Sequence, residues 1–176
     1  MKNSVFTFVN VAKMRDQKRQ DRLVEAAIYL KEKGYDFKIQ LVGDGPNLEK
    51  ITNMVKENNV EDKVEILGLQ TNPYPYIKNA DFFVLSSYME GYGIVIKEAL
   101  LLRTKVVTTD VVGPREILEN GKYGIIVPND DESLKYALED ILKNKYKYKK
   151  LESELKKYKG DNEEIKEKTL KLLNLC

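Results

Sequence analysis

The fold is decided by the stretch from Asp81 to Leu101, which reads DFFVLSSYMEGYGIVIKEALL. Phe82 to Leu85 is a short and wholly apolar run, which is typical of a strand buried on both faces of a sheet. Gly91 and Gly93 follow in a loop, and Ile94 to Leu102 has the composition of a helix. A buried strand, a glycine-containing loop and a helix, in that order, form the repeating unit of a parallel α/β sheet.

The same alternation extends in both directions from this stretch. Strands are predicted at residues 5–11, 37–42, 64–67, 82–85, 106–108 and 124–127. Helices are expected around residues 23–30, 48–55, 74–79, 94–102, 115–119 and from 130 or 131 to about 143. Asn47 and either Asp130 or Asp131 are the expected N-terminal caps. The sequence therefore predicts a doubly wound, Rossmann-like parallel α/β sheet of about six strands in residues 1–143. Residues 144–176 would form a helical tail that is broken near Gly160-Asp161.

Composition restricts the possible functions. The 176 residues are 42% hydrophobic and 33% charged, as in a soluble globular domain, and a net charge of +2 does not favour nucleic acid as a partner. No apolar run reaches the roughly 20 residues that a membrane-spanning helix needs. The single cysteine, Cys176, excludes a disulfide framework and points to a reducing, cytoplasmic compartment. Histidine is absent, so acid–base chemistry would fall to carboxylates, lysine or tyrosine.

Candidate site residues lie in the loops after predicted strands, where parallel sheets bind their ligands. Gly91 and Gly93 would let the backbone approach a ligand, and the free amides at the start of the following helix suit a diphosphate. Glu90 and Glu98 could face the same crevice and accept hydrogen bonds from sugar hydroxyls. Two glutamates eight residues apart are also compatible with coincidence in a chain that has 28 acidic residues.

The other loops are less specific. Lys13 and Lys18 follow the first predicted strand and could neutralise a leaving diphosphate, but solvated surface lysines are the simpler interpretation. The turn at residues 43–46 lacks the third glycine of a dinucleotide fingerprint and, alone, predicts only a tight turn. The loop expected at residues 113–116 contains Arg115, which could bind an anion or lie on the surface. No Asp-x-Asp pair and no Cys/His cluster indicates a metal site.

Taken in order, these segments resemble the donor-binding domain of family-four glycosyltransferases, which have the two-domain GT-B fold. Each matching segment is weak alone, but the ordered set at matching spacing is specific. The segment EGYGIVIKEA at residues 90–99 is similar to the family's Glu-x7-Glu motif. The likeness runs over about residues 5–142 and is carried by residues 11–21, 41–46, 67–69, 79–87, 90–99, 113–117 and 124–128.

The resemblance implies roles for individual residues. Lys13 and Lys18 would bind the donor diphosphate and act in catalysis by stabilising its developing charge. Glu90 would contact the donor sugar as the third catalytic group, and Glu98 would bind the ribose hydroxyls. The remaining donor contacts would come from Gly43, Gly68, Leu69, Gly91, Tyr92, Gly93 and Ile94.

The resemblance also implies a reaction. A hexose or N-acetylhexosamine would pass, with retention of configuration, from a UDP- or GDP-linked sugar to a glycan or lipid-linked acceptor. Neither metal nor cofactor would be needed. The acceptor would bind an N-terminal domain that the sequence lacks, so we expect half of an enzyme, which binds nucleotide but transfers no sugar. The tail would include the helix that crosses back to that domain, and the full-length protein could lie at the inner face of the membrane.

Two departures from the family pattern and two alternative functions stay open. Lys13 stands where the family usually has arginine, so donor affinity could be altered. Residues 101–105 replace the usual A/C-G-x-P turn, so we expect a slightly different helix exit.

The chain could instead be half of a sugar-nucleotide 2-epimerase, which shares the two-domain fold, or a stand-alone nucleotide-binding module.

Overall fold

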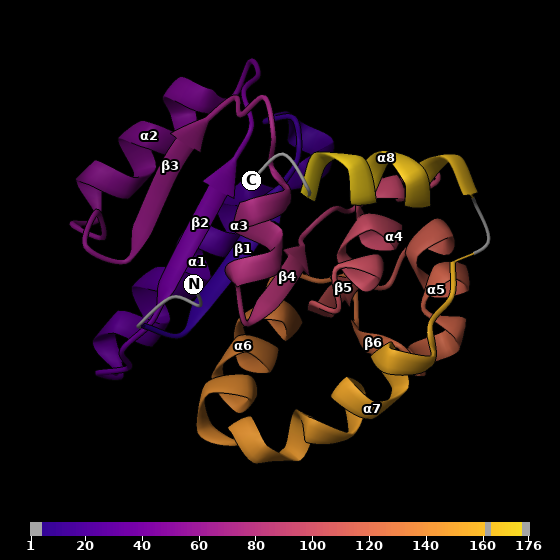
Figure 1. Cartoon of the computed structure of the whole chain (residues 1–176). Coiled ribbons are helices and arrows are strands. Elements are labelled where there is room, and N and C mark those ends of the chain that lie inside the picture. The colour runs from indigo at the N-terminus through magenta and orange to yellow at the C-terminus, as the bar shows by residue number, and fades with distance from the viewer. Residues whose placement is uncertain (1–4, 161–162, 174–176) are drawn as a thin grey trace.

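The computed structural model describes residues 5–160 and 163–173. Within this part, the strands form one parallel sheet of six in the order β3-β2-β1-β4-β5-β6 (Figure 1). The predicted α/β class is thus confirmed. The order reverses between β1 and β4, which makes the carboxyl ends of these two strands the switch point of the sheet. The strands are β1 (Thr7–Val11), β2 (Lys38–Val42), β3 (Val64–Gly68), β4 (Phe82–Leu85), β5 (Lys105–Thr109) and β6 (Gly124–Val127).

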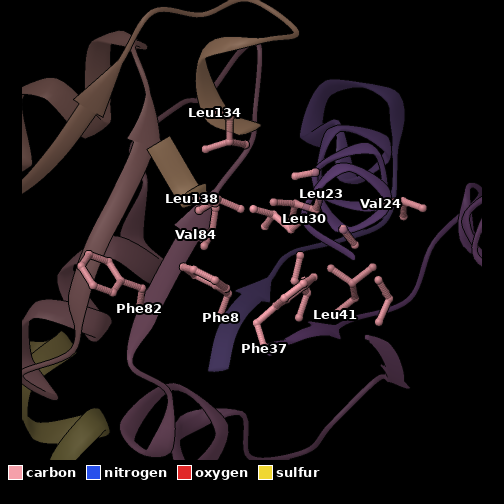
Figure 2. Close-up of a cluster of buried hydrophobic side chains, with 14 of the residues drawn as sticks. Phe8, Leu23, Val24, Leu30, Phe37, Leu41, Phe82, Val84, Leu134 and Leu138 are labelled. Carbon is pink, nitrogen blue, oxygen red and sulfur yellow. The ribbon is translucent and has the colours of Figure 1, made fainter. Parts of the chain in front are cut away.

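Helices cover both faces of the sheet because successive side chains of each strand point to opposite faces. Phe8 and Val84 enter a core under α1 (Gln20–Glu32), α2 (Leu48–Glu57) and α6 (Ser133–Lys143), shown in Figure 2. Val9 and Leu85 enter a second core, on the opposite face. Burial of one large apolar side chain stabilises the fold by about 1.5–3 kcal/mol, so both cores contribute strongly. The helices that line the second core are α3 (Tyr74–Asn79), α4 (Ile94–Leu101), α5 (Val112–Ile117), α7 (Lys149–Lys157) and α8 (Glu163–Leu173).

The start of α5 differs from its prediction. This helix begins at Val112 rather than Arg115, so Gly113 and Pro114 lie in its first turn and not in a loop. Proline is tolerated there because the amide it lacks would have no partner inside the helix. Residues 119–121 form a separate 3-10 turn instead of the end of this helix.

The two expected helix caps behave differently. Asn47 stands at the start of α2 but does not cap it with its side chain, whose Nδ2 donates to Asp16 Oδ1 at 2.8 Å. Asp130 stands two residues before Glu132, the N-cap of α6, but its Oδ1 accepts hydrogen bonds from the Glu132 and Ser133 amides at 2.9 and 2.6 Å, so its side chain does satisfy amides at the start of the helix. The alternative cap, Asp131, is bound to arginines.

The residues after α6 pack on the sheet domain. The helix α8 (Glu163–Leu173) contacts α3 and α4 (Figure 1). Arg103 has a φ of 62°, the left-handed conformation that glycine usually supplies after a helix, and its guanidinium donates to the carbonyls of Leu155 and Tyr158. The helix exit therefore keeps the left-handed turn without glycine. Gly160 also has a positive φ, of 73°, at the predicted break, while Asp161 lies outside the described residues. None of the described helices is long and apolar enough to cross a membrane.

Candidate functional site

The loops that follow β1 and β4 are joined at the switch point. The Tyr88 amide donates to the Gln17 carbonyl at 3.1 Å, and Ser86 Oγ donates to the Lys18 carbonyl at 2.7 Å. Lys18 Nζ lies 2.6 Å from Glu90 Oε2, which also accepts a hydrogen bond from Ser87 Oγ at 3.1 Å. The structure thus brings together two predicted site residues that are far apart in the sequence.

The Lys18–Glu90 pair is largely shielded from water. The side chains of lysine and glutamate are only 13% and 11% exposed, so dissolved salt screens their attraction weakly. A buried charge without a partner is costly, and here each group supplies the countercharge of the other. A phosphate group could replace Glu90 as the partner of Lys18 without leaving the ammonium uncompensated.

Arg22, which was not among the residues predicted from sequence, makes hydrogen bonds that connect α1 to the loops after β4 and β6. Its side chain is 4% exposed and donates to the Ser86 carbonyl at 3.2 Å, to Asn129 Oδ1 at 2.8 Å and to Asp131 Oδ1 at 2.8 Å. The hydrogen bond from Arg22 to Asp131 lowers the pKa of that carboxyl. Only the fold could reveal this role, because the partners of Arg22 lie 64 to 109 residues away in the chain.

The turn after β2 packs against the loop after β1 by backbone contact. A Cβ atom on Gly43 would lie 2.0 Å from the Ala12 carbonyl oxygen, and one on Gly45 would lie 2.3 Å from that of Met14. These glycines also have φ angles of 140° and 156°. The turn at residues 43–46 thus requires glycine at both positions, for conformation and for space.

This close contact forms one wall of a pocket of about 780 Å³. Lys13, Gly43 and Leu69, all predicted donor-site residues, line it, and the Gly68 carbonyl accepts a hydrogen bond from the Gly43 amide at 2.8 Å. The volume is in the range of small-molecule sites, about 300–1,000 Å³. Leu69 is 78% exposed, which leaves an apolar surface available to a flat ring. The lining residues are Val11, Ala12, Lys13, Val42, Gly43, Asp44, Gly45, Pro46, Leu69, Gln70 and Pro73.

Glu98 lies in α4, which begins after Gly93, a residue with a φ of 61°. Glu98 Oε1 accepts a hydrogen bond from the Tyr74 hydroxyl at 2.7 Å. Burial and this hydrogen bond raise the pKa of Tyr74 to about 12, so the phenol keeps its proton near neutral pH and acts as the donor. Tyr74 was not among the site residues predicted from the sequence, so this contact was missed. An alternating run of Tyr and Pro at residues 73–76 gives no signal for it.

Residues 91–94, from the loop before α4 to the first residue of that helix, do not line the 780 Å³ pocket. Tyr92 is 65% exposed, and Lys97 Nζ lies 4.8 Å from the centre of its ring. Tyr92 lines a second pocket, of about 430 Å³, that shares no lining residue with the first. Gly91 contacts α5 so closely that a Cβ on Gly113 would lie 2.2 Å from its carbonyl oxygen. Ile94, at the start of α4, is 50% exposed.

The remaining candidates are an arginine and a metal site. Arg115 lies on the surface and donates from Nε to Asp110 Oδ1 at 2.8 Å, so its charge is already compensated. Among the residues that the structure describes, no group of three or more His, Cys, Asp or Glu side chains could hold a metal ion. Binding without metal stays a prediction.

Comparison with known proteins identifies the family. The sequence pattern of the family described as "Glycosyl transferases group 1" matches residues 2–159. The chain is 34% identical over 148 residues to an N-acetylgalactosamine-N,N'-diacetylbacillosaminyl-diphospho-undecaprenol 4-alpha-N-acetylgalactosaminyltransferase of Campylobacter jejuni, covering 80% of this chain and 40% of that protein. It is 30% identical over 172 residues to a poly(ribitol-phosphate) alpha-N-acetylglucosaminyltransferase of Staphylococcus aureus, covering 94% of this chain and 34% of that protein.

A solved structure of an S. aureus protein, TarM, has the same fold over nearly the whole of this chain. A mutant of S. aureus TarM, in complex with fondaparinux, alpha-GlcNAc-glycerol and UDP, superimposes with a TM-score of 0.81 at 26% identity. The match covers 99% of this chain and 36% of that one. The chain spans between about a third and two fifths of the length of these curated relatives. The family pattern covers most of the chain and agrees with the sheet topology and the ordered loop motifs, so this chain belongs to the group 1 glycosyltransferases.

Proposed function

We propose that this chain is the donor-binding domain of a retaining glycosyltransferase. The whole enzyme would move a hexose or N-acetylhexosamine from a nucleoside diphosphate sugar to a glycan or lipid-linked acceptor. The observation that carries the proposal is the Lys18–Glu90 ion pair at the switch point. It supplies a cation suited to a diphosphate and a carboxylate suited to sugar hydroxyls in one crevice.

The diphosphate would bind between Lys18 and Lys13. When a donor enters, Lys18 turns from Glu90 to the phosphate oxygens, and Glu90 is released to accept hydrogen bonds from the sugar. As the bond to the anomeric carbon breaks, negative charge grows on the leaving diphosphate, and the two ammonium groups stabilise it. The free amides at the start of α4 add partial positive charge. These groups replace a divalent ion, so we propose a reaction without metal.

The nucleoside would bind on the other side of the diphosphate. The pocket beside Lys13 is lined by backbone and apolar atoms, with Leu69 exposed to stack against a base. Glu98 would bind the ribose hydroxyls with charged hydrogen bonds. The presence of UDP in the TarM complex supports a nucleoside diphosphate as the ligand.

The acceptor would bind a second domain of the whole protein. The names of the C. jejuni and S. aureus relatives specify a diphospho-undecaprenol-linked sugar and poly(ribitol-phosphate), which supports a glycan or lipid-linked acceptor. Such an enzyme would work in the cytoplasm, at the inner face of the membrane where a lipid-linked acceptor is presented.

Calorimetric titration of the chain with UDP and with GDP tests the proposal. The preferred nucleotide should bind, and Glu98→Ala should weaken its binding about tenfold or more, because a charged hydrogen bond contributes about 1.5–3 kcal/mol. Glu49→Ala, which removes an exposed carboxylate on α2, is the matched control and should bind as the wild type does. Absence of binding to both nucleotides, or equal affinity of wild type and Glu98→Ala, would overturn the proposal.

A further inference from the structure

One hydrogen bond joins α8 to the segment that carries Tyr74, and a second hydrogen bond links the same asparagine to Tyr74. Asn72 Nδ2 donates to the Leu172 carbonyl of α8 at 3.1 Å. The other end of the same amide group, Asn72 Oδ1, accepts a hydrogen bond from the Tyr74 backbone amide at 3.2 Å. One asparagine therefore connects the C-terminal helix to the start of α3. The neighbouring Pro73 lines the 780 Å³ pocket, so this connection lies at the pocket rim.

The Tyr74 side chain continues from this anchor toward Glu98. Its ring is 2% exposed, and its hydroxyl donates to Glu98 Oε1 at 2.7 Å. Thr169 of α8 is 1% exposed, and α8 packs against both α3, which carries Tyr74, and α4. The Thr169 hydroxyl opposes the rise in the pKa of Tyr74 that burial and Glu98 cause. The Tyr74 phenol thus lies between α8 and the carboxylate of α4.

A glutamate side chain has three rotatable bonds, and fixing them when a ligand binds costs conformational entropy. A hydrogen bond from a buried, rigid tyrosine fixes the carboxylate before the ligand arrives. Tyr74 is well suited to this because its ring is fully packed and its hydroxyl keeps its proton near neutral pH.

We propose that Tyr74, anchored from α8, is a positioning residue that fixes the Glu98 carboxylate in the orientation that binds the ribose hydroxyls. This inference rests on the proposed function. In addition, α8 becomes a part of the nucleotide site although none of its side chains that the structure describes lines the pocket.

A double-mutant cycle measures the role of Tyr74. UDP and GDP are titrated into wild type, Tyr74→Phe, Glu98→Ala and the double variant, and the better nucleotide is used throughout. Tyr74→Phe should weaken binding about fivefold to tenfold in the wild-type background and have no effect in the Glu98→Ala background, because the two residues act as a unit. A purely structural role of Tyr74 would weaken binding equally in both backgrounds.

Tyr148→Phe is the matched control. Tyr148 also donates its hydroxyl to a carboxylate, Asp140, but its side chain packs against the opposite core. It should bind nucleotide as the wild type does, and urea denaturation should show both single tyrosine variants folded. Asn72→Ala, which removes the bond to Leu172, should weaken binding about twofold to fivefold through Tyr74.

The outcomes separate the two hypotheses. Failure of the wild type to bind either nucleotide would refute the proposed function. If the wild type binds and Glu98→Ala weakens it, the proposed function stands. Equal loss from Tyr74→Phe in both backgrounds, or no loss in either, would then refute the positioning role. Unchanged binding by Asn72→Ala would refute the anchoring from α8.

Discussion

The loop after β1 meets its two neighbours in different ways. Charged side chains hold the loop after β1 against the loop after β4, chiefly the Lys18–Glu90 pair and the buried guanidinium of Arg22. Against the turn after β2, backbone atoms hold it, with Gly43 and Gly45 in close contact with carbonyl groups. The loop after β1 thus has an electrostatic side, against the loop after β4, and a steric side, against the turn after β2.

The difference determines what each side can do when a ligand arrives. A charged side chain can exchange its partner for a phosphate or a hydroxyl, because another group then compensates the charge. Backbone atoms in close contact cannot change partners in this way, so the wall at residues 43–46 keeps its shape. We infer that the steric side fixes the shape of the pocket, whereas the electrostatic side can rearrange. Substitutions on each side test this contrast.

The steric side should be the more sensitive to a single added methyl group. Gly43→Ala should lower the free energy of unfolding by about 3 kcal/mol, because its φ of 140° and the nearby Ala12 carbonyl both oppose a side chain. Gly34→Ala is the control: its φ is 77°, but no atom lies within 4 Å of the added Cβ. We expect a loss of about 1 kcal/mol there. Equal losses in urea denaturation would show that conformation alone accounts for Gly43.

On the electrostatic side, Arg22→Met should lower the free energy of unfolding by about 1–3 kcal/mol, because buried acceptors lose their donor. Arg115→Met is the matched control, since the ion pair of Arg115 with Asp110 lies on the surface and should not change stability measurably. Thermal or urea unfolding distinguishes the two. Similar stability of both variants would mean that Arg22 does not stabilise the joined loops.

Lys18→Met should affect the ligand more than the fold. We expect the affinity for the preferred nucleoside diphosphate to fall about tenfold or more, while the affinity for the corresponding nucleoside stays unchanged. Adding Glu90→Gln should recover stability, because no buried carboxylate is left unpaired, but should not recover affinity. Lys56→Met, which removes an exposed cation on α2, serves as the control in the same titrations. A parallel loss for the nucleoside would place Lys18 outside the diphosphate site.

Removal of metal should have the smallest effect. With ammonium groups and a helix start available for the diphosphate, titrations with and without EDTA should agree within about twofold. A tenfold loss on chelation would show that the electrostatic side is completed by a metal ion and not by Lys13 and Lys18 alone.

Sequence alone was sufficient where the signal is local. Phe82 to Leu85 predicted a strand buried on both faces, and the chain does place its alternate side chains in two cores. The order of the loop motifs predicted the family, and the family pattern confirms it. Helix boundaries were predicted less well: Pro114 looked like part of a loop because the sequence does not reveal that a helix starts two residues before it.

Contacts between residues distant in the chain could be found only in the folded structure. The sequence could name Lys18, Glu90 and Glu98, because they stand near the ends of predicted strands and match the family's motifs in order. It could not reveal that Lys18 and Glu90 neutralise each other, or that Tyr74 holds Glu98. The physical reason is that strand and helix patterns arise from neighbours along the chain, whereas burial and charge pairing depend on which elements the folded sheet brings together.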